Sequence, residues 1–333
     1  MKICIVKLSA MGDIIHSMVA LQFIKYELPD VKIDWIVESS FKGILENNRD
    51  INKILPIDLK LIKQNKSEFF AQIKLLRDYS KNNYDLIIDA QGLLKSAIVS
   101  KLLKNKTSGS IVVGFDKKSI REGIATWFYD KKISIAYDKN TIDRNVKVLT
   151  SLFRSEITSK DILSKKPFLF FCENKSIKLH NEYNLFVIGS TWDSRNYPKE
   201  KFVKIADALK TKTYIVWGSD EEYNKAVWME KQSKFLEILP KGNLNDLKYI
   251  ISKSKLLIGN DTGPTHMAWG LGIPSITIFG PTPINRVYIT DINKVIKSQS
   301  KINHLKLNKL DFSINEIKPE DIIAIAREIA QKT

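Results

Sequence analysis

The chain has few cysteines and few histidines. Cys4 and Cys172 are its only cysteines, and its four histidines show no spacing typical of metal ligands. This composition excludes a disulfide framework and argues against a structural zinc site. Since Cys4 falls in the first apolar run, we expect a buried free thiol and a reducing compartment.

Long hydrophobic runs are also absent. No window approaches the roughly 20 apolar residues that a membrane-spanning helix needs. Lys7, Asp13 and His16 interrupt the N-terminal stretch that would otherwise resemble a signal peptide. We therefore expect a cytoplasmic protein whose contact with any membrane is peripheral.

Three common catalytic motifs are missing. No G-x-G-x-x-G follows the first strand, which disfavours a nicotinamide enzyme. No G-x-x-x-x-G-K-[ST] is present, which disfavours a P-loop nucleotidase, and no G-x-S-x-G nucleophile elbow occurs.

Acidic residues are outnumbered by basic ones, 37 Asp and Glu against 53 Lys and Arg, so the chain carries a formal net charge of +16. Residues 1–150 hold 25 Lys and Arg against 17 Asp and Glu, net +8, and the remainder holds 28 against 20, also +8. Such a surface suits a polyanion, either nucleic acid or an anionic membrane, and a solvated lysine-rich surface without a partner is the alternative. A nucleic-acid-binding protein should concentrate its basic residues in a stripe, and the even division argues against it.

Strands and helices alternate along the chain, which predicts parallel α/β sheets. A length of 333 residues indicates two domains. The predicted strands are 3–6, 33–38, 53–56, 84–89, 111–115, 185–190, 214–218, 256–258 and 275–279. The predicted helices are 14–25, 41–47, 67–82, one that ends near 104, 143–154, 198–209, one from 220, 244–252, one that begins after 261, and 319–330.

The polar stretch 158–182 marks the expected domain boundary. We assign 1–165 to an N-terminal domain and 166–315 to a C-terminal domain. We expect the segment 316–333 to form a C-terminal helix that packs back on the first domain.

Each half contains a loop of small residues that leads from a strand into a helix. In the first, Asp13 lies where it could cap the helix and also where a ligand of an open α/β sheet would bind. In the second, Asp261-Thr262-Gly263 precedes a helix whose free N–H groups and dipole form an anion site. A second rigid turn follows at 280–283. Either loop alone could be ordinary turn chemistry.

Two further groups point to a phosphate and a sugar. Thr191 and Arg195 supply a hydroxyl and a guanidinium before a helix, and Arg suits bidentate phosphate contacts. Glu222 ends an acidic run, 220–222, after a strand, where one carboxylate could bind ribose hydroxyls. The alternatives are a surface Arg and acidic residues that favour a helix N-terminus.

Three motifs together resemble the lipopolysaccharide heptosyltransferases, glycosyltransferase family nine. They are Lys7-x-Ser9-x-Met11-Gly12-Asp13-Ile14-Ile15-His16, Asp89-Ala90-Gln91-Gly92-Leu93-Leu94-Lys95-Ser96, and Asn260-Asp261-Thr262-Gly263-Pro264-Thr265-His266 with Gly280-Pro281-Thr282. Within the family the first two motifs look most like the type I members. The resemblance implies a GT-B fold, in which two Rossmann-like domains face each other across a cleft. It also implies that the N-terminal domain, 1–165, binds the acceptor and that the C-terminal domain, 166–315, binds the nucleotide sugar.

The resemblance also implies an activity: inverting transfer of heptose from ADP-heptose to the Kdo of Kdo-lipid A, without a metal or other cofactor. The missing D-x-D motif agrees with metal-free transfer. The partners would be this donor, this acceptor and the inner leaflet, with no nucleic acid, and we expect a monomer peripheral on the inner membrane of a Gram-negative bacterium. The alternatives are a type II enzyme or a member with another donor or acceptor.

Site residues carry over from the family by position. Asp13 matches the general base and Lys7 lies near it. The donor set is Thr191, Arg195, Glu222, Asp261, Thr262, Gly263 and His266, with Glu222 on the ribose and Arg195 near the diphosphate. The acceptor set is Gly12, Lys60, Lys63, Arg121 and Arg144. Ala10 replaces a hydroxyl residue that is common in the family.

Overall fold

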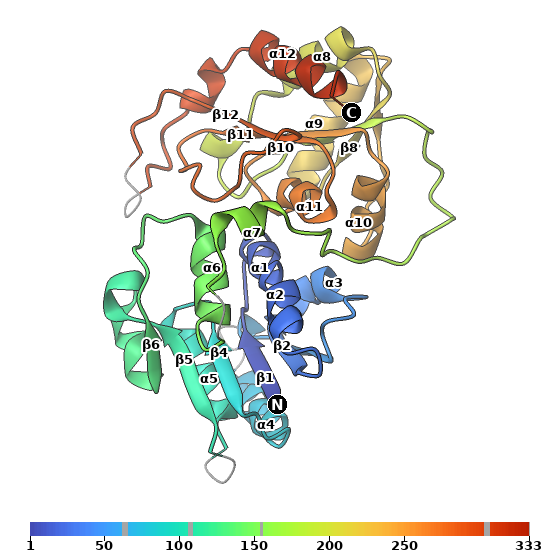
Figure 1. Ribbon diagram of the computed structural model, residues 1–333. Helices are drawn as coiled ribbons and strands as arrows, with labels where there is room; N and C mark the ends of the chain where they lie inside the picture. Colours follow the sequence, from blue (N-terminus) through green and yellow to red (C-terminus); the bar gives the residue numbers. More distant parts are fainter. Residues whose placement is uncertain (62–65, 106–108, 154–155, 303–306, 333) are drawn as a thin grey trace. The chain divides into compact units, whose positions relative to one another are not determined.

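A computed structural model describes residues 1–333 except 62–65, 106–108, 154–155, 303–306 and 333 (Figure 1). The chain divides into two compact units, Met1–Phe170 and Phe171–Thr333. The division falls inside the polar stretch 158–182. No helix among the described residues combines the length and the apolar character needed to cross a membrane.

The first unit contains a parallel sheet of six strands in the order β3-β2-β1-β4-β5-β6. The strands are β1 (Lys2–Val6), β2 (Lys32–Glu38), β3 (Lys53–Ile57), β4 (Leu86–Asp89), β5 (Ile111–Phe115) and β6 (Lys131–Ile133). This is the strand order of a Rossmann domain, and it reverses between β1 and β4, where Val6 pairs with Asp89. Ligands of such sheets bind at the carboxyl ends of the strands at this reversal.

Helices cover both faces of the first sheet. They are α1 (Met11–Met18), α2 (Ala20–Glu27), α3 (Lys42–Leu45), α4 (Lys66–Ser80), α5 (Leu94–Leu103), α6 (Thr141–Thr150) and α7 (Ser159–Leu163). One layer contains α1, α2 and α6, which contact one another, and the other contains α4, α5 and the 3-10 helix η4 (Gly123–Phe128) (Figure 1). Because both faces are covered, the central strands are nearly continuous apolar runs.

The second unit repeats this plan. Its six strands are all parallel, in the order β12-β11-β10-β7-β8-β9, so the order again reverses at β7 and β10. The strands are β7 (Asn184–Val187), β8 (Thr213–Val216), β9 (Leu236–Ile238), β10 (Leu256–Asn260), β11 (Ser275–Phe279) and β12 (Asn293–Lys297). The helices are α8 (Lys199–Leu209), α9 (Asp220–Gln232), α10 (Leu244–Ser252), α11 (Gly263–Leu271) and α12 (Pro319–Ala330). The predicted pair of Rossmann-like α/β units is confirmed.

The last helix belongs to the second unit. α12 packs against α8, and its Ile322, Ala326 and Ile329 are buried in the same core as Phe186 and Phe202. The segment that the sequence analysis set apart as 316–333 therefore completes the hydrophobic core of this unit, because an apolar face at helical spacing must be buried against something.

The predicted helix 14–25 differs from the structure. Two helices, α1 and α2, occupy this region and are separated at Val19. The first begins at Met11 with Ala10 as its N-cap, so Asp13 lies in the first turn and is not the cap residue. The short strands β6, β9 and β12 were not predicted, because all three lie at sheet edges and carry charged residues.

Candidate active site

In the first unit, two loops meet at the carboxyl ends of β1 and β4. The Lys7 ammonium donates to the Ala90 carbonyl at 2.7 Å and to Asn145 Oδ1 at 3.1 Å. In the opposite direction, Gln91 Oε1 accepts the backbone N–H groups of Leu8 at 3.1 Å and Ser9 at 3.2 Å. The turn after β4 thus fixes the loop that leads into α1.

The side chain of Asp89 holds that turn in place. Its buried carboxylate accepts the N–H of Gln91 at 2.8 Å, the Ser96 hydroxyl at 2.8 Å and the Tyr129 hydroxyl at 2.7 Å. Burial raises the pKa of Asp89, and these hydrogen bonds oppose the rise. Gly92 also donates to Asp89 and has a φ of +69°, and a Cβ there would lie 2.7 Å from Ile120 Cγ2. Only glycine fits this turn.

Asp13 lies at the start of α1 and is half-buried. Its carboxylate accepts the N–H of Ala10 at 3.4 Å. Burial lowers the pKa of Lys7, whereas the negative charges of Asp13 and Asp89 raise it, so the Lys7 ammonium and the Asp13 carboxylate interact electrostatically. A carboxylate placed at the carboxyl end of β1 can accept a proton from a bound hydroxyl.

The residues expected at the acceptor are spread over the first unit. Gly12 lies in the first turn of α1, next to Asp13. Lys60 is exposed, with its Nζ 5.7 Å from the centroid of the Phe41 ring, and Arg121 is exposed. Lys63 lies outside the described residues.

The Arg144 side chain makes its contacts with other groups of the first unit. Its guanidinium donates to the Ser119 carbonyl at 2.6 Å and to the Ala136 carbonyl at 3.0 Å, and it lies 4.8 Å from the centroid of the Tyr137 ring. Burial lowers the pKa of Arg144. These contacts connect α6 to the segment between η3 (Lys117–Ser119) and Tyr137, so Arg144 shapes this part of the unit.

In the second unit, Asp261 connects three of its neighbours at the carboxyl end of β10. Asp261 is only 2% exposed. Its Oδ2 accepts Arg195 Nη2 at 2.7 Å and the Thr282 hydroxyl at 2.9 Å, and its Oδ1 lies 3.0 Å from His266 Nε2. Burial alone would raise the pKa of Asp261, but the His266 hydrogen bond and the charge of Arg195 hold it well below its usual range.

The helix α11 begins beside this cluster. Its N-cap is Thr262, which is half-buried and whose side chain makes no capping hydrogen bond. In the first turn, the N–H groups of Gly263 and Thr265 have no helical acceptor, whereas Pro264 between them has no N–H. Together with the helix dipole, these groups form a binding site for an anion such as a phosphate.

The loop between β7 and α8 is held against β10 by Asn260. The Asn260 amide accepts the Tyr197 N–H at 3.0 Å and donates to the Ile188 carbonyl at 2.8 Å. Within the described residues, four side chains of this loop contain buried polar atoms without a hydrogen-bond partner: Ser190 Oγ, Ser194 Oγ, Arg195 Nε and Asn196 Oδ1. Such atoms are rare in native proteins, and their concentration in one loop suits a polar ligand.

Thr191 and Glu222 complete the group of candidate residues in the second unit. Thr191 is exposed, and its hydroxyl accepts Arg195 Nη1 at 3.4 Å. Glu222 accepts the N–H of Gly218 at 2.6 Å. A Cβ on Gly189 would collide with the Glu222 carboxylate, so the glycine at the end of β7 makes room for this side chain. The structure therefore brings Thr191, Arg195, Asp261 and His266 together and places Glu222 at the ends of β7 and β8.

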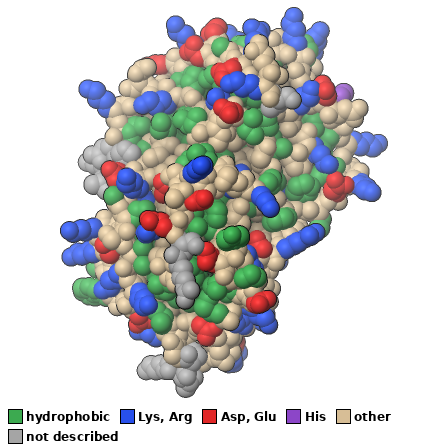
Figure 2. Space-filling view, in the orientation of Figure 1, with side chains coloured by type: hydrophobic (Ala, Val, Ile, Leu, Met, Phe, Trp, Pro, Cys, Tyr) green, Lys and Arg blue, Asp and Glu red, His purple; other side chains and the backbone are tan. Residues whose placement is uncertain are grey.

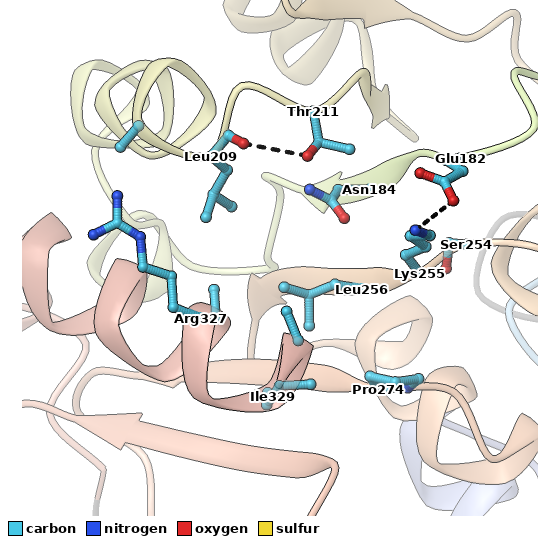
Figure 3. A pocket seen from close by; sticks show the side chains of 13 residues that line it. Glu182, Asn184, Leu209, Thr211, Ser254, Lys255, Leu256, Pro274, Arg327 and Ile329 are labelled. Carbon is cyan, nitrogen blue, oxygen red and sulfur yellow. Dashed lines mark hydrogen bonds and ion pairs between the residues drawn. The ribbon is translucent and has the colours of Figure 1, made fainter. Parts of the chain in front are cut away.

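A pocket of about 580 Å³ lies at the other end of the second sheet (Figure 3). Asn184 and Leu256 line it at the first residues of β7 and β10, and Glu182 and Lys255 form an ion pair of 2.6 Å there. It lies at the amino ends of the strands, away from the carboxyl ends where α/β sheets bind ligands, and we do not assign it to the active site. No cluster of three or more His, Cys, Asp or Glu side chains that could hold a metal occurs in the described part of the chain.

Comparison with known proteins identifies the family. The model of glycosyltransferase family 9 (heptosyltransferase) matches residues 72–312. The chain belongs to this family. Lipopolysaccharide heptosyltransferase 1 of Campylobacter coli is 36% identical over 99% of both chains. Lipopolysaccharide heptosyltransferase 1 of Escherichia coli K12 is 27% identical over 92% of this chain and 97% of its own.

Solved structures of other family members show the same fold. The structure described as E. coli heptosyltransferase WaaC with ADP-2-deoxy-2-fluoro heptose matches all of both chains with a TM-score of 0.80 at 22% identity. The match to the structure of E. coli ADP-heptose lps heptosyltransferase II covers all of this chain and 99% of that one, with a TM-score of 0.76 at 16% identity. The predicted resemblance to heptosyltransferases and the GT-B type of fold are thus confirmed.

Three residues that organise this glycosyltransferase had no predicted role. Gln91, Asn260 and Thr282 each stand inside a quoted motif, yet their function is to position neighbouring groups. The signal was available for Gln91 and Asn260, because an amide side chain at the end of a buried strand has backbone groups of the next loop within reach.

Proposed function

We propose that the chain transfers L-glycero-D-manno-heptose from ADP-heptose to the Kdo of Kdo-lipid A, with inversion, in the synthesis of the lipopolysaccharide inner core. The observation that carries the proposal is the Arg195–Asp261–His266 cluster at the start of α11. It provides a prepared anion site for a nucleoside diphosphate. The two named relatives are lipopolysaccharide heptosyltransferases 1, which supports the substrates.

Asp13 acts as the general base in this proposal. Its carboxylate takes the proton of the Kdo hydroxyl as that oxygen attacks the anomeric carbon of the heptose. The anomeric bond to the diphosphate breaks, and ADP leaves with the electron pair. A base of this kind contributes roughly 10²–10⁴ in rate. The negative charge of Asp13 raises the pKa of Lys7, so the two side chains interact electrostatically.

The second unit binds the donor in this proposal. The N–H groups at Thr262 and Gly263, with the Thr191 hydroxyl and the Arg195 guanidinium, contact the diphosphate and stabilise the charge that develops on ADP. His266 and Asp261 lie toward the heptose, and Asp261 also orients Arg195. Glu222 accepts hydrogen bonds from the ribose hydroxyls. We propose that no metal takes part.

The acceptor is anionic and is anchored in a membrane. Gly12, Lys60, Lys63, Arg121 and Arg144 are the proposed acceptor side of the site, with Arg144 acting through the segment that it holds. We infer a monomer that works peripherally on the cytoplasmic face of the inner membrane. Figure 2 shows Lys and Arg side chains scattered over the face in view, not gathered into the stripe expected of a nucleic-acid-binding protein.

The test is a transfer assay with EDTA present. The purified chain is incubated with ADP-heptose and either Kdo-lipid A or heptosyl-Kdo-lipid A, and products are identified by mass spectrometry. The proposal requires transfer to Kdo-lipid A. Transfer only to the heptosylated acceptor would identify a type II enzyme, and transfer only from another donor would change the sugar.

A further inference from the structure

An apolar patch lies exposed on the α5–η4 layer of the first unit. Its members are Leu94 and Ile98 on α5, and Ile124 and Trp127 on η4, with exposed fractions of 36%, 42%, 55% and 80%. Leu94 and Ile98 are four residues apart on an α-helix, so they share one face. Ile124 and Trp127 are three residues apart on a 3-10 helix, in which side chains at this spacing eclipse.

The two helices that carry these pairs are neighbours in the fold. α5 packs against η4, and the Leu94 N–H donates to the Glu122 carboxylate at 2.7 Å, just before η4 begins. We call Leu94, Ile98, Ile124 and Trp127 the α5–η4 patch. Monomeric proteins rarely expose several large apolar side chains side by side without a partner.

The chain segment that carries the patch is rich in basic residues. Residues 91–132 contain nine Lys and Arg against three Asp and Glu, net +6. The exposed ones are Lys95, Lys101, Lys117, Lys118, Arg121, Lys131 and Lys132.

Each of the three acidic side chains of this segment accepts a hydrogen bond from another group of the same unit. Asp116 accepts the Ser119 N–H at 2.9 Å, Asp130 accepts Lys104 Nζ at 2.7 Å, and Glu122 accepts the Leu94 N–H at 2.7 Å. The segment therefore carries an excess of exposed basic side chains together with the exposed apolar ones.

We propose that the α5–η4 patch docks on an anionic phospholipid bilayer. An apolar surface with a tryptophan, in a segment rich in Lys and Arg, has the composition of an interfacial membrane-binding face. Trp127 and Ile124 enter the headgroup boundary, and the lysines of this segment contact anionic headgroups. The inference rests on the proposed function in one respect, because a lipid-anchored acceptor would be held in that bilayer. α5 follows directly from the turn of Asp89 and Gln91, so docking brings the site to the membrane.

The experiment measures sedimentation of the full chain with vesicles, without donor or acceptor. Vesicles of phosphatidylglycerol and phosphatidylethanolamine are compared with vesicles of phosphatidylcholine alone. We expect binding to the anionic vesicles that falls steeply as NaCl is raised, and weakening by at least about tenfold in the double variant Ile124→Ser/Trp127→Ser. The matched control is Tyr26→Ser, on α2 in the other helical layer, where Tyr26 is 84% exposed. It should bind as the wild type does.

Three results would overturn the proposal: no binding of the wild type to anionic vesicles, equal binding of the double variant, or equal loss in Tyr26→Ser. Sedimentation equilibrium addresses a second copy as the occupant. A wild-type dimer that the double variant abolishes, with vesicle binding unchanged, would make the patch a dimer interface.

Heptose transfer to a deacylated Kdo acceptor separates this proposal from the proposed function. The double variant should transfer heptose to this water-soluble acceptor at the wild-type rate, because neither Ile124 nor Trp127 is among the proposed donor- or acceptor-binding residues. If the wild type transfers heptose but does not bind vesicles, only the proposed docking surface is wrong. If it binds vesicles through the patch yet transfers no heptose, only the proposed function is wrong.

Discussion

The side-chain oxygen of Gln91 accepts the backbone N–H of Leu8 at 3.1 Å, so the turn after β4 holds the loop that leads to Asp13. The same oxygen accepts the N–H of Ser9, and Lys7 returns a hydrogen bond to Ala90. Gln91 is thus a positioning residue in this structure. Misplacement of a reacting group by about 1 Å can cost on the order of 10²-fold in rate.

Replacing Gln91 with Met should therefore lower kcat by about 10- to 100-fold while the KM for the acceptor changes little. Hydrogen exchange should show faster exchange at the Leu8 and Ser9 amides. Gln91→Glu keeps an acceptor oxygen and should preserve that protection. A raised acceptor KM with unchanged exchange in Gln91→Met would instead make Gln91 a substrate contact.

Gly189 should be intolerant of a side chain. A Cβ there would collide with the Glu222 carboxylate, and forced overpacking of this kind costs about 1–3 kcal/mol. We expect Gly189→Ala to weaken ADP binding by about tenfold, measured by calorimetry. The control is Gly218→Ala, whose Cβ would lie 3.5 Å from Glu222 Oε2 in ordinary contact and which keeps its N–H. Equal affinities for both variants would remove Glu222 from the donor site.

The Asp261 cluster should be essential for stability. Asp261→Ala leaves Arg195 and His266 without their carboxylate, and loss of one partner of a buried pair costs roughly 3–5 kcal/mol. We expect the free energy of unfolding of the second unit to fall by about this amount in urea titrations. A change below about 1 kcal/mol would show that the cluster is not coupled to folding.

The ionisation of Asp261 should also make the free energy of unfolding depend on pH. The pKa of Asp261 is held well below its usual range in the folded chain, whereas the unfolded value is about 3.9. A depressed pKa gives stability that is present above the unfolded value and is lost as pH falls through the folded one. The difference in unfolding free energy between the wild type and Asp261→Asn should therefore be constant from about pH 5 to 7 and shrink below about pH 4. A difference that grows as the pH falls would contradict the assignment.

Features that depend on a short stretch of sequence could be predicted. The buried strands of each half read as apolar runs, and the loops at Asp13 and Asp261 were recognised because small residues stand between a strand and a helix. Prediction failed on the start of α1, since the preceding loop residue Ala10 has no side-chain acceptor to mark it as an N-cap. Short edge strands such as β9 and β12 have little apolar pattern of their own.

The contacts that organise the site could not be predicted, because they connect distant positions. Arg195 meets Asp261 across 66 residues and Gln91 meets Leu8 across 83. Each pairing depends on which strands are neighbours in the sheet, and strand order is not written in any single segment. Sequence also cannot tell a ligand-binding charge from a structural one. The charge of Arg144 suggested a contact with the acceptor, yet its guanidinium donates to two carbonyls of its own unit.

The central claim is that Asp13 is the base of a heptose transfer, and one assay tests it most directly. Transfer from ADP-heptose to Kdo-lipid A is measured with EDTA present for the wild type, Asp13→Ala and Asp13→Asn. The account predicts product with the wild type and a loss of about 10²–10⁴-fold in both variants, while calorimetry shows unchanged ADP affinity. Activity of either variant within a few-fold of wild type would show that Asp13 is only a residue of the first helical turn.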